Sequence, residues 1–252
     1  IIKEENYEIL KENIGKRVEP HIKTEYVFQT NKFLKEEYQN LLKDRVKPLG
    51  TAHAILCAKE KVDGPFAVIN ADDFYGRDAY EKAKSYLYNF KEKEYGIVAY
   101  RLGNTLTPNG SAKRGVCEVD ENNNLIQLTE SKVILKNDEA EVEPLDGSPI
   151  FLTSKNTIAC MNFLLFDLSI FDLIEKKLDI FLEENKNDLN TCEFLIPEVL
   201  NDYVKQEKGK VYIIETSAVW YGVTYKEDKE MVVEALKKLT DENIYPQNLW
   251  KL

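Results

Sequence analysis

One short segment of this chain constrains its fold more than any other. Residues 66–70 (Phe-Ala-Val-Ile-Asn) form an apolar run, and two adjacent carboxylates, Asp72 and Asp73, follow almost at once. A continuous apolar run of this length is typical of a strand that is covered on both faces. Open α/β sheets bind their ligands at the carboxyl ends of such strands. The segment therefore predicts an α/β fold with a polar site where this strand ends.

Strand and helix patterns alternate around this run. A helix-like stretch at 52–61 precedes it, another at 78–90 follows it, and an apolar strand pattern occupies 95–102. Such alternation favours a sheet of mainly parallel strands with helices on both faces. We therefore expect a three-layer α/β/α fold with a Rossmann-like, mostly parallel mixed sheet.

The remaining segments are less regular, but they show no domain linker and no internal repeat. Residues 120–124 favour a hairpin turn, and the acidic residues 136–146 are expected to form a surface excursion. Further helices are expected at 5–14, 33–46, 169–184, 193–206 and 226–239, and further strands at 25–29, 157–166 and 210–215. We therefore expect residues 1–252 to form a single domain.

The charge and composition of the chain exclude several classes of partner. Its 44 acidic and 34 basic residues give a formal net charge of −10, which argues against binding to nucleic acid or to a membrane surface. No apolar run approaches the roughly 20 residues that are needed to cross a bilayer. The four cysteines are scattered without a C-x-x-C pair, so a reducing, cytoplasmic setting is expected. A homo-oligomer is compatible with the sequence.

Two segments carry residues suited to catalysis or binding. Asp72 and Asp73 could hold Mg²⁺, a hard cation that prefers oxygen ligands, or either could cap the following helix. Residues 48–54 (Pro-Leu-Gly-Thr-Ala-His-Ala) place Gly50 at a helix start, where a base or phosphate can approach the backbone. The alternative there is an ordinary turn with Thr51 as the N-cap. Taken singly, each segment is compatible with a binding role and with an ordinary structural role.

The order of these segments resembles that of the sugar-1-phosphate nucleotidyltransferases, within the nucleotide-diphospho-sugar transferase superfamily. That family has a glutamine after a strand, then a Gly-x-Ala helix start, then a strand ending in a metal-binding aspartate; Gln29, Gly50 and Asp72 follow this order. Later family segments are similar to residues 115–120 (Gly-Val-Cys-Glu-Val-Asp), 129–132 (Thr-Glu-Ser-Lys), 161–163 (Met-Asn-Phe) and 220–224 (Trp-Tyr-Gly-Val-Thr). Each motif is short, and their order is the specific part.

The resemblance implies roles at the nucleotide and at the metal. Gln29, Gly50 and Thr51 would bind the nucleotide. Asp72 would hold Mg²⁺, with Asp73 as a second ligand. The implied substrates are a nucleoside triphosphate and a sugar-1-phosphate.

It also implies contacts to the sugar phosphate. Glu130, Lys132 and Asn162 would bind it, and Arg114 is a catalytic candidate on charge and position alone. The structural alternatives are a solvated strand end for Glu130 and a satisfied buried amide for Asn162.

Several departures from the family pattern bear on activity. The family's Gly-rich loop, with its Gly-x-Gly-Thr-Arg signature, is absent, and so is a downstream phosphate-binding lysine. Ser131 displaces Lys132 by one position from the family's usual Glu-Lys, and Gly222 stands near the place of the usual second metal aspartate. Either Asp73 or Asp228 would substitute for that aspartate, or one protein carboxylate would suffice and substrate phosphates would fill the remaining coordination. Because the chain opens on Ile-Ile-Lys, like the tail of a strand, we expect it to be truncated at its N-terminus. Because the Gly-rich loop and the family's phosphate-binding arginine and lysine are missing, we expect the chain to be inactive alone.

The implied reaction transfers a nucleoside monophosphate from the triphosphate to the sugar-1-phosphate and releases pyrophosphate. Positioning and charge neutralisation would suffice, because the substrate phosphate is itself the nucleophile. Three alternatives remain: a cytidylyltransferase acting on an alcohol phosphate, a glycosyltransferase of the same fold, and a non-catalytic nucleotide-binding domain.

Overall fold

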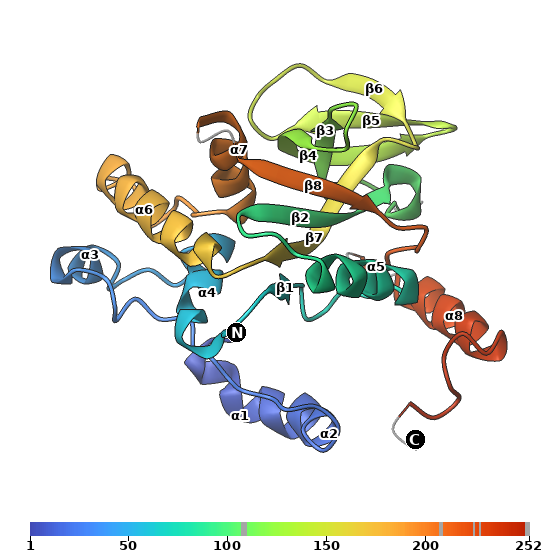
Figure 1. Ribbon diagram of the computed structural model, residues 1–252, viewed down its shortest axis with the longest axis horizontal. Helices are drawn as coiled ribbons and strands as arrows, with labels where there is room; N and C mark the ends of the chain where they lie inside the picture. Colours follow the sequence, from blue (N-terminus) through green and yellow to red (C-terminus); the bar gives the residue numbers. More distant parts are fainter. Residues whose placement is uncertain (107–109, 207–208, 224, 227, 250–252) are drawn as a thin grey trace. The chain divides into compact units, whose positions relative to one another are not determined.

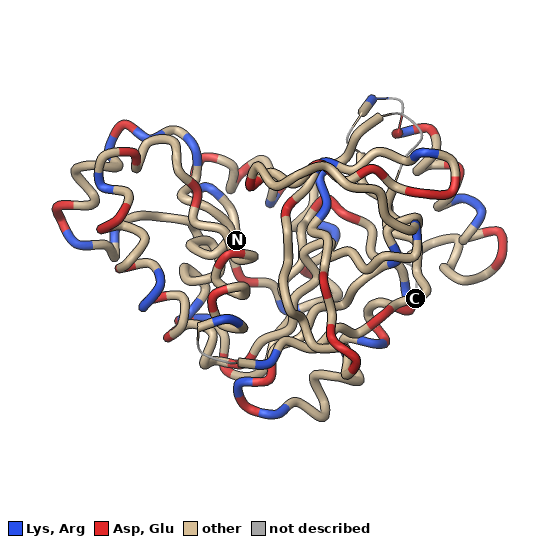
Figure 2. The backbone as a smooth tube through the Cα atoms, turned by 90° about the horizontal axis from the view of Figure 1, so that it is seen from above, with Lys and Arg blue, Asp and Glu red and all other residues tan. Residues whose placement is uncertain are grey.

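The computed structural model describes residues 1–106, 110–206, 209–223, 225–226 and 228–249. The chain divides into two compact units. The first comprises Ile1–Gly64 with Asp167–Val199, and the second comprises Pro65–Phe166 with Leu200–Leu252. None of the described helices is both long and apolar enough to span a membrane. Figure 2 shows acidic and basic residues interspersed along the backbone.

The first unit is built from helices and turns. Its elements are η1 (Glu4–Asn6), α1 (Tyr7–Leu10), the π-type turn η2 (Lys11–Gly15), α2 (Lys16–Val18), α3 (Glu36–Leu41), α4 (Thr51–Cys57), η3 (Lys59–Lys61) and α6 (Ser169–Glu184). Helix α4 packs against α6, and the Lys59 ammonium pairs with the Glu175 carboxylate at 2.9 Å. We expected a strand at 25–29, but the structure has only a single β-bridge there, between Phe28 and Ile2. Among the described residues, no strand pairs with the rest of this segment.

The second unit is organised around an eight-stranded sheet (Figure 1). Its strands are β1 (Phe66–Val68), β2 (Glu94–Arg101), β3 (Ala112–Val119), β4 (Leu125–Lys136), β5 (Glu139–Pro144), β6 (Phe151–Ser154), β7 (Ile158–Phe166) and β8 (Lys210–Glu215). They lie in the order β6-β5-β4-β3-β7-β2-β8, and β1 also pairs with β7. Strand β5 lies within 136–146, which we had expected to form a surface excursion, so this segment extends the sheet.

The sheet is mixed, as expected, but its pairing is less parallel than the sequence pattern predicted. Among the described strands, β2 and β8 form the one parallel pair, and every other pairing is antiparallel. Two features account for this. Strand β7 runs antiparallel to both β1 and β2, and β3 to β6 follow one another through short turns, which join only antiparallel neighbours. The α/β fold class is confirmed, and "mostly parallel" is corrected.

Helices cover both faces of this sheet. Helix α5 (Arg77–Tyr88) buries Ala79 and Ala83 in a cluster with Val98, Phe163 and neighbouring apolar residues. The last turns of α7 (Ile196–Gln206) lie on the opposite face, where Tyr203 stacks against Tyr95 with ring centroids 4.8 Å apart. The three-layer arrangement therefore holds for this unit. Helix α8 (Asp228–Asp241) follows β8 and the Trp220 segment.

Candidate functional site

A short turn follows β1 and carries the two adjacent carboxylates. The Asn70 amide group donates a hydrogen bond to Asp73 Oδ2 at 2.9 Å, and the Asn70 main-chain N–H donates to the Tyr75 hydroxyl at 3.0 Å. Asp72 is exposed, whereas Asp73 is partly buried. Helix α5 begins at Arg77 with Gly76 as its N-cap and without a side-chain cap. Neither carboxylate therefore caps the helix, which removes the simpler structural role considered for them.

Asp73 sits in an environment that disfavours its charge. Burial is the largest cause and raises its carboxyl pKa, and the neighbouring Asp72 charge adds to the effect. Hydrogen bonds from Asn70 and Tyr75 act in the opposite direction. The Trp220 indole N–H also lowers the pKa of Asp73. It does so by proximity, because its geometry is not that of a normal hydrogen bond. Asp73 is therefore less acidic than an ordinary aspartate.

Tyr75 connects this turn to the interior of the sheet. Its hydroxyl donates to the Met161 carbonyl at 2.9 Å and lies 3.2 Å from Asp73 Oδ2. The Tyr100 hydroxyl in turn donates to the Tyr75 carbonyl at 2.7 Å. Tyr75 is almost fully buried, and burial raises the pKa of its hydroxyl. It therefore stays protonated and fixes the carboxylate turn against β7.

Strand β7 is irregular at the point where Tyr75 meets it. Its pairing with β2 shifts register, since Ile97 faces Leu164 whereas Ala99 faces Cys160. Within this bulge Asn162 adopts a left-handed conformation with φ of 60°. Asparagine tolerates that region better than most residues, and bulges re-aim side chains next to binding sites. The bulge therefore explains why an asparagine stands in an otherwise apolar strand.

The same stretch of β7 also lacks a neighbour on its other edge. Strand β3 pairs with β7 at Ala159 and Cys160, and β1 pairs with it from Leu164 onward. The residues between, 161–163, have no strand partner on that side among the described strands. The sheet therefore opens beside Asn162, and the carboxylate turn after β1 is fixed to this opening through Tyr75.

Arg114, the sequence-predicted catalytic arginine, is buried within the second unit. Its Nε donates to the Thr105 carbonyl and to the Thr105 hydroxyl, each at 3.1 Å. The guanidinium stacks on the Trp220 ring, 4.6 Å from its centroid. Burial lowers the pKa of Arg114 to about 10, and the charges of Asp73 and other carboxylates oppose that shift. Arg114 stays charged at neutral pH, but protein groups hold it and only 5% of it is exposed.

Glu130 and Lys132 lie on the opposite face of the sheet from Arg114. In the pairing of β3 with β4, Glu130 lies opposite Gly115 and Lys132 lies opposite Lys113, and opposite residues share a face of the sheet. Arg114 lies between Lys113 and Gly115, so its side chain points to the other face. Burial raises the carboxyl pKa of Glu130, and the Lys113 charge is the largest opposing effect. Lys132 forms a half-exposed ion pair with Glu143 at 3.4 Å. Glu130 is therefore a partly buried carboxylate, and the exposed Lys113 lies on the same face of the sheet, where both side chains could meet a polar ligand.

The two other positions considered for a second metal ligand have structural roles. Asp228 is 1% exposed and accepts a hydrogen bond from the Tyr225 main-chain N–H at 2.8 Å. At Gly222 an added Cβ would come within 2.2 Å of the Trp220 ring, so a larger residue would displace that ring. Among the described residues, no group of three or more His, Cys, Asp or Glu side chains gathers to hold a metal ion.

In the first unit, the predicted nucleotide-binding residues lie together. Gln29 Nε2 donates to the Gly50 carbonyl at 3.0 Å and lies 3.1 Å from His53 Nδ1. The Thr51 hydroxyl accepts a hydrogen bond from the Ile196 main-chain N–H at 3.1 Å. Gly50 has φ of 139°, and a Cβ there would come within 2.1 Å of the Phe194 carbonyl oxygen, so only glycine fits.

The Gln29 contacts also fix the state of His53. Because Gln29 Nε2 is a donor, His53 Nδ1 must accept, so the neutral ring carries its proton on Nε2. Burial is the main cause that lowers the pKa of His53 to about 4, helped by the Arg45 charge. These residues line a polar pocket of about 250 Å³.

Comparison with known proteins gives similarity in structure only. No protein-family model matches the chain, and no curated protein matches it in sequence. Three similar solved structures are a protein named as a glucose-1-phosphate thymidylyltransferase from Bacillus anthracis, in complex with a sucrose, a UDP-glucose pyrophosphorylase complexed with UDP-glucose, and HddC from Yersinia pseudotuberculosis.

The likeness to these three structures is distant. Identities are 16%, 17% and 16%, and TM-scores are 0.48, 0.45 and 0.43. The matches cover 74%, 76% and 80% of this chain. They span 60% and 64% of the first two solved chains, less than two thirds of their length, and 75% of the third.

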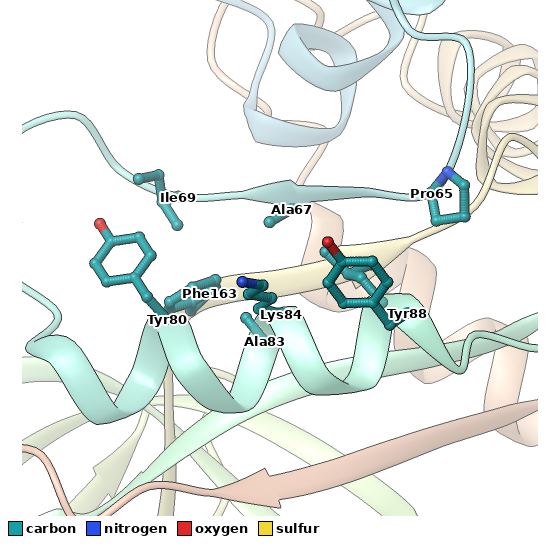
Figure 3. A pocket seen from close by; sticks show the side chains of 9 residues that line it. Pro65, Ala67, Ile69, Tyr80, Ala83, Lys84, Tyr88 and Phe163 are labelled. Carbon is teal, nitrogen blue, oxygen red and sulfur yellow. The ribbon is translucent and has the colours of Figure 1, made fainter. Parts of the chain in front are cut away.

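A second hollow, of about 450 Å³, lies between β1 and α5. Figure 3 shows Ala67 and Ile69 on one side of it and Tyr80, Ala83 and Lys84 on the other. Its lining is apolar except for the tips of Lys84 and the tyrosines. It therefore suits apolar groups better than a phosphate or a sugar.

Sequence reasoning missed three residues of the site in the second unit. Tyr75 looked like an ordinary residue before a helix, although its place two residues after Asp73 was a local signal. Lys113 adjoins the singled-out Arg114 but carried no motif of its own. Trp220 was noted only as part of a late motif, and its stacking on Arg114 joins segments that are distant in sequence.

Proposed function

We propose that this chain belongs to a Mg²⁺-dependent nucleotidyltransferase that transfers a nucleoside monophosphate to a sugar-1-phosphate. The observation that carries the proposal is the junction at Tyr75. There the carboxylate turn after β1 meets the β7 bulge that presents Asn162. A metal-binding turn and a hydroxyl-binding amide are needed side by side, because the reacting phosphates lie between the metal and the sugar.

The residues after β1 fit a magnesium ion. Mg²⁺ is usually held by one or two carboxylates together with substrate phosphates, so a dense cluster of acidic residues is not required. Asp72 offers an exposed carboxylate, and Asp73 engages Asn70 and Tyr75 through Oδ2. When bound, the ion would neutralise phosphate charge and orient the phosphate oxygens. Asp73 must be ionised to take part, and its raised pKa makes that step sensitive to pH.

The chain's own side chains would bind and orient the substrates. Asn162 and Glu130 would hydrogen-bond the sugar hydroxyls, and Lys113 or Lys132 would contact the sugar phosphate. Arg114 is better suited to holding the Trp220 segment in place than to touching a phosphate, because it is buried against Thr105.

The Gln29–Gly50 pair would contact the nucleotide base. Thr51 would act through its main chain, since its hydroxyl is engaged with Ile196. Each of these residues positions a group, and none becomes a covalent nucleophile, because the sugar phosphate oxygen attacks the α-phosphorus directly.

The test is pyrophosphate release by the natural full-length protein that carries this sequence, assayed with a panel of triphosphates and acceptors. We expect release that requires a sugar-1-phosphate. Release with CTP and phosphocholine alone would favour the cytidylyltransferase alternative. Nucleotide binding without any release would favour a non-catalytic domain.

A further inference from the structure

Strand β6 ends the sheet with an open edge. It lies last in the strand order and pairs with β5 through Phe151 opposite Val142, Leu152 opposite Glu141 and the two pairs that follow. No other described strand pairs with its outer edge. Figure 1 shows β6 at the outer side of the β3–β6 meander. Unpaired strand edges present main-chain donors and acceptors that favour pairing with another strand.

The residues on and beside this edge are apolar and exposed. Ile150, Phe151 and Leu152 have exposures of 61%, 44% and 57%. Phe151 continues a cross-strand row that begins in the core, where Val133 and Val142 are 0% and 1% exposed. The core row therefore runs to the edge of the sheet and stops without a covering partner.

We propose that β6 pairs antiparallel with β6 of a second copy of this chain, forming a dimer with a continuous sheet. An antiparallel edge is self-complementary, because a two-fold axis places the same strand opposite itself. Extension across the axis would cover the exposed apolar side chains of both copies.

The charges around β6 fit this occupant and this orientation. Positions 150–154 carry no charge, so two copies of this acidic protein can approach there with least repulsion. Asp146 precedes the strand, and Lys155 follows it, beside its own partner Asp138 at 2.7 Å. Antiparallel pairing brings Asp146 of each copy to the end where Lys155 of the other lies. Parallel pairing would instead place like charges together.

The first test is sedimentation of the wild-type protein over a range of concentrations, compared with a Phe151→Lys/Leu152→Lys variant. We expect a reversible dimer that the variant weakens at least about tenfold, as for a central apolar contact. Val233→Lys is the matched control, since Val233 is 58% exposed on α8. A wild-type monomer at all concentrations, or a dimer that the double variant leaves intact, would overturn the proposal.

A charge exchange tests the orientation with little risk to folding. Asp146→Lys and Lys155→Asp should each weaken the dimer several-fold, on the order of the coupling of exposed ion pairs. The combined exchange should restore it. If the combined variant does not recover the dimer affinity, antiparallel pairing is refuted. If the exchange changes only the binding of an unrelated strand-forming protein and not the dimer, the edge of β6 belongs to that partner instead.

Discussion

The Tyr75 hydroxyl donates a hydrogen bond to the Met161 carbonyl at 2.9 Å and lies 3.2 Å from Asp73 Oδ2. One buried phenol therefore joins the carboxylate turn to the bulge that carries Asn162. A change at Tyr75 should affect metal binding and sugar-phosphate binding together, although Tyr75 contacts neither ligand in the proposed function.

Tyr75→Phe should destabilise the fold and weaken both ligands. The Met161 carbonyl and the Asn70 N–H lose a buried partner, so the free energy of unfolding should fall by about 2 kcal/mol. Calorimetric titration should show weaker binding of Mg²⁺ and of sugar-1-phosphate. Tyr86→Phe, which removes a hydroxyl bonded to Glu94 O at 2.9 Å, should lower stability alone. Unchanged affinities in Tyr75→Phe would contradict the positioning role.

Asp72→Asn should weaken divalent-metal binding in the presence of nucleotide and leave the fold intact. Because Asp72 is exposed, its replacement should change the free energy of unfolding by less than about 0.5 kcal/mol. Metal titration followed by calorimetry measures the first quantity, and denaturant unfolding the second. Asp63→Asn, at another exposed aspartate, is the control. Equal metal affinity in the two variants would remove Asp72 from the metal site.

Metal affinity should also depend on pH in a defined direction. The raised pKa of Asp73 means that protonation begins at a higher pH than for an ordinary aspartate, so affinity should weaken early as pH falls. In Asp73→Asn this part of the pH dependence should disappear. A wild-type affinity that is flat with pH would show that Asp73 takes no part.

Glu130→Ala should weaken sugar-phosphate binding by roughly 1–3 kcal/mol and triphosphate binding much less, because the sugar hydroxyl groups lose a partly buried acceptor. Calorimetry with each substrate separately gives the comparison. Glu139→Ala is the control, since this exposed glutamate lies on β5 of the same sheet and has no role in the proposed site. Equal losses for both substrates would make Glu130 a structural residue.

His53 should make stability fall in acid. Its pKa is lowered to about 4 from the ordinary 6.5, so between these values the unfolded chain binds a proton that the folded chain does not. The stabilisation is present above pH 6.5 and is lost as pH falls, by up to about 3 kcal/mol. Denaturant unfolding of wild type and His53→Gln across this range measures it. His21→Gln, at the other histidine, controls for losing an imidazole; identical profiles for wild type and His53→Gln would disprove the assignment.

The parts of the fold that local sequence determines were predictable. The apolar run at 66–70, the carboxylates after it and the helix that follows are encoded within a few residues, and β1 and α5 confirm the strand and the helix. The expectation that this strand is covered on both faces was wrong, because Ala67 is exposed and Ile69 is 40% exposed. At Gly50 the sequence predicted a close approach to the backbone, and the Phe194 carbonyl makes one. The expected approach of a base or phosphate to Gly50 stays a prediction.

Features that depend on distant segments were not predictable. The direction of β7 relative to β1 and β2 depends on how three strands assemble, and alternation of helices and strands does not specify it. The bulge at Asn162 depends on a register shift against β2. The burial of Arg114, a catalytic candidate on charge and position alone, depends on Thr105 and Trp220, which adjoin it only in the folded unit.

The most direct test of the proposed function is Mg²⁺-dependent pyrophosphate release by the natural full-length protein and its Asp72→Asn variant. Both would be assayed with nucleoside triphosphate, with and without sugar-1-phosphate. The account predicts release in the wild type that needs both Mg²⁺ and the sugar phosphate, and loss of nearly all turnover in a variant that stays folded. Near wild-type release by Asp72→Asn, or release that does not require a sugar-1-phosphate, would contradict it.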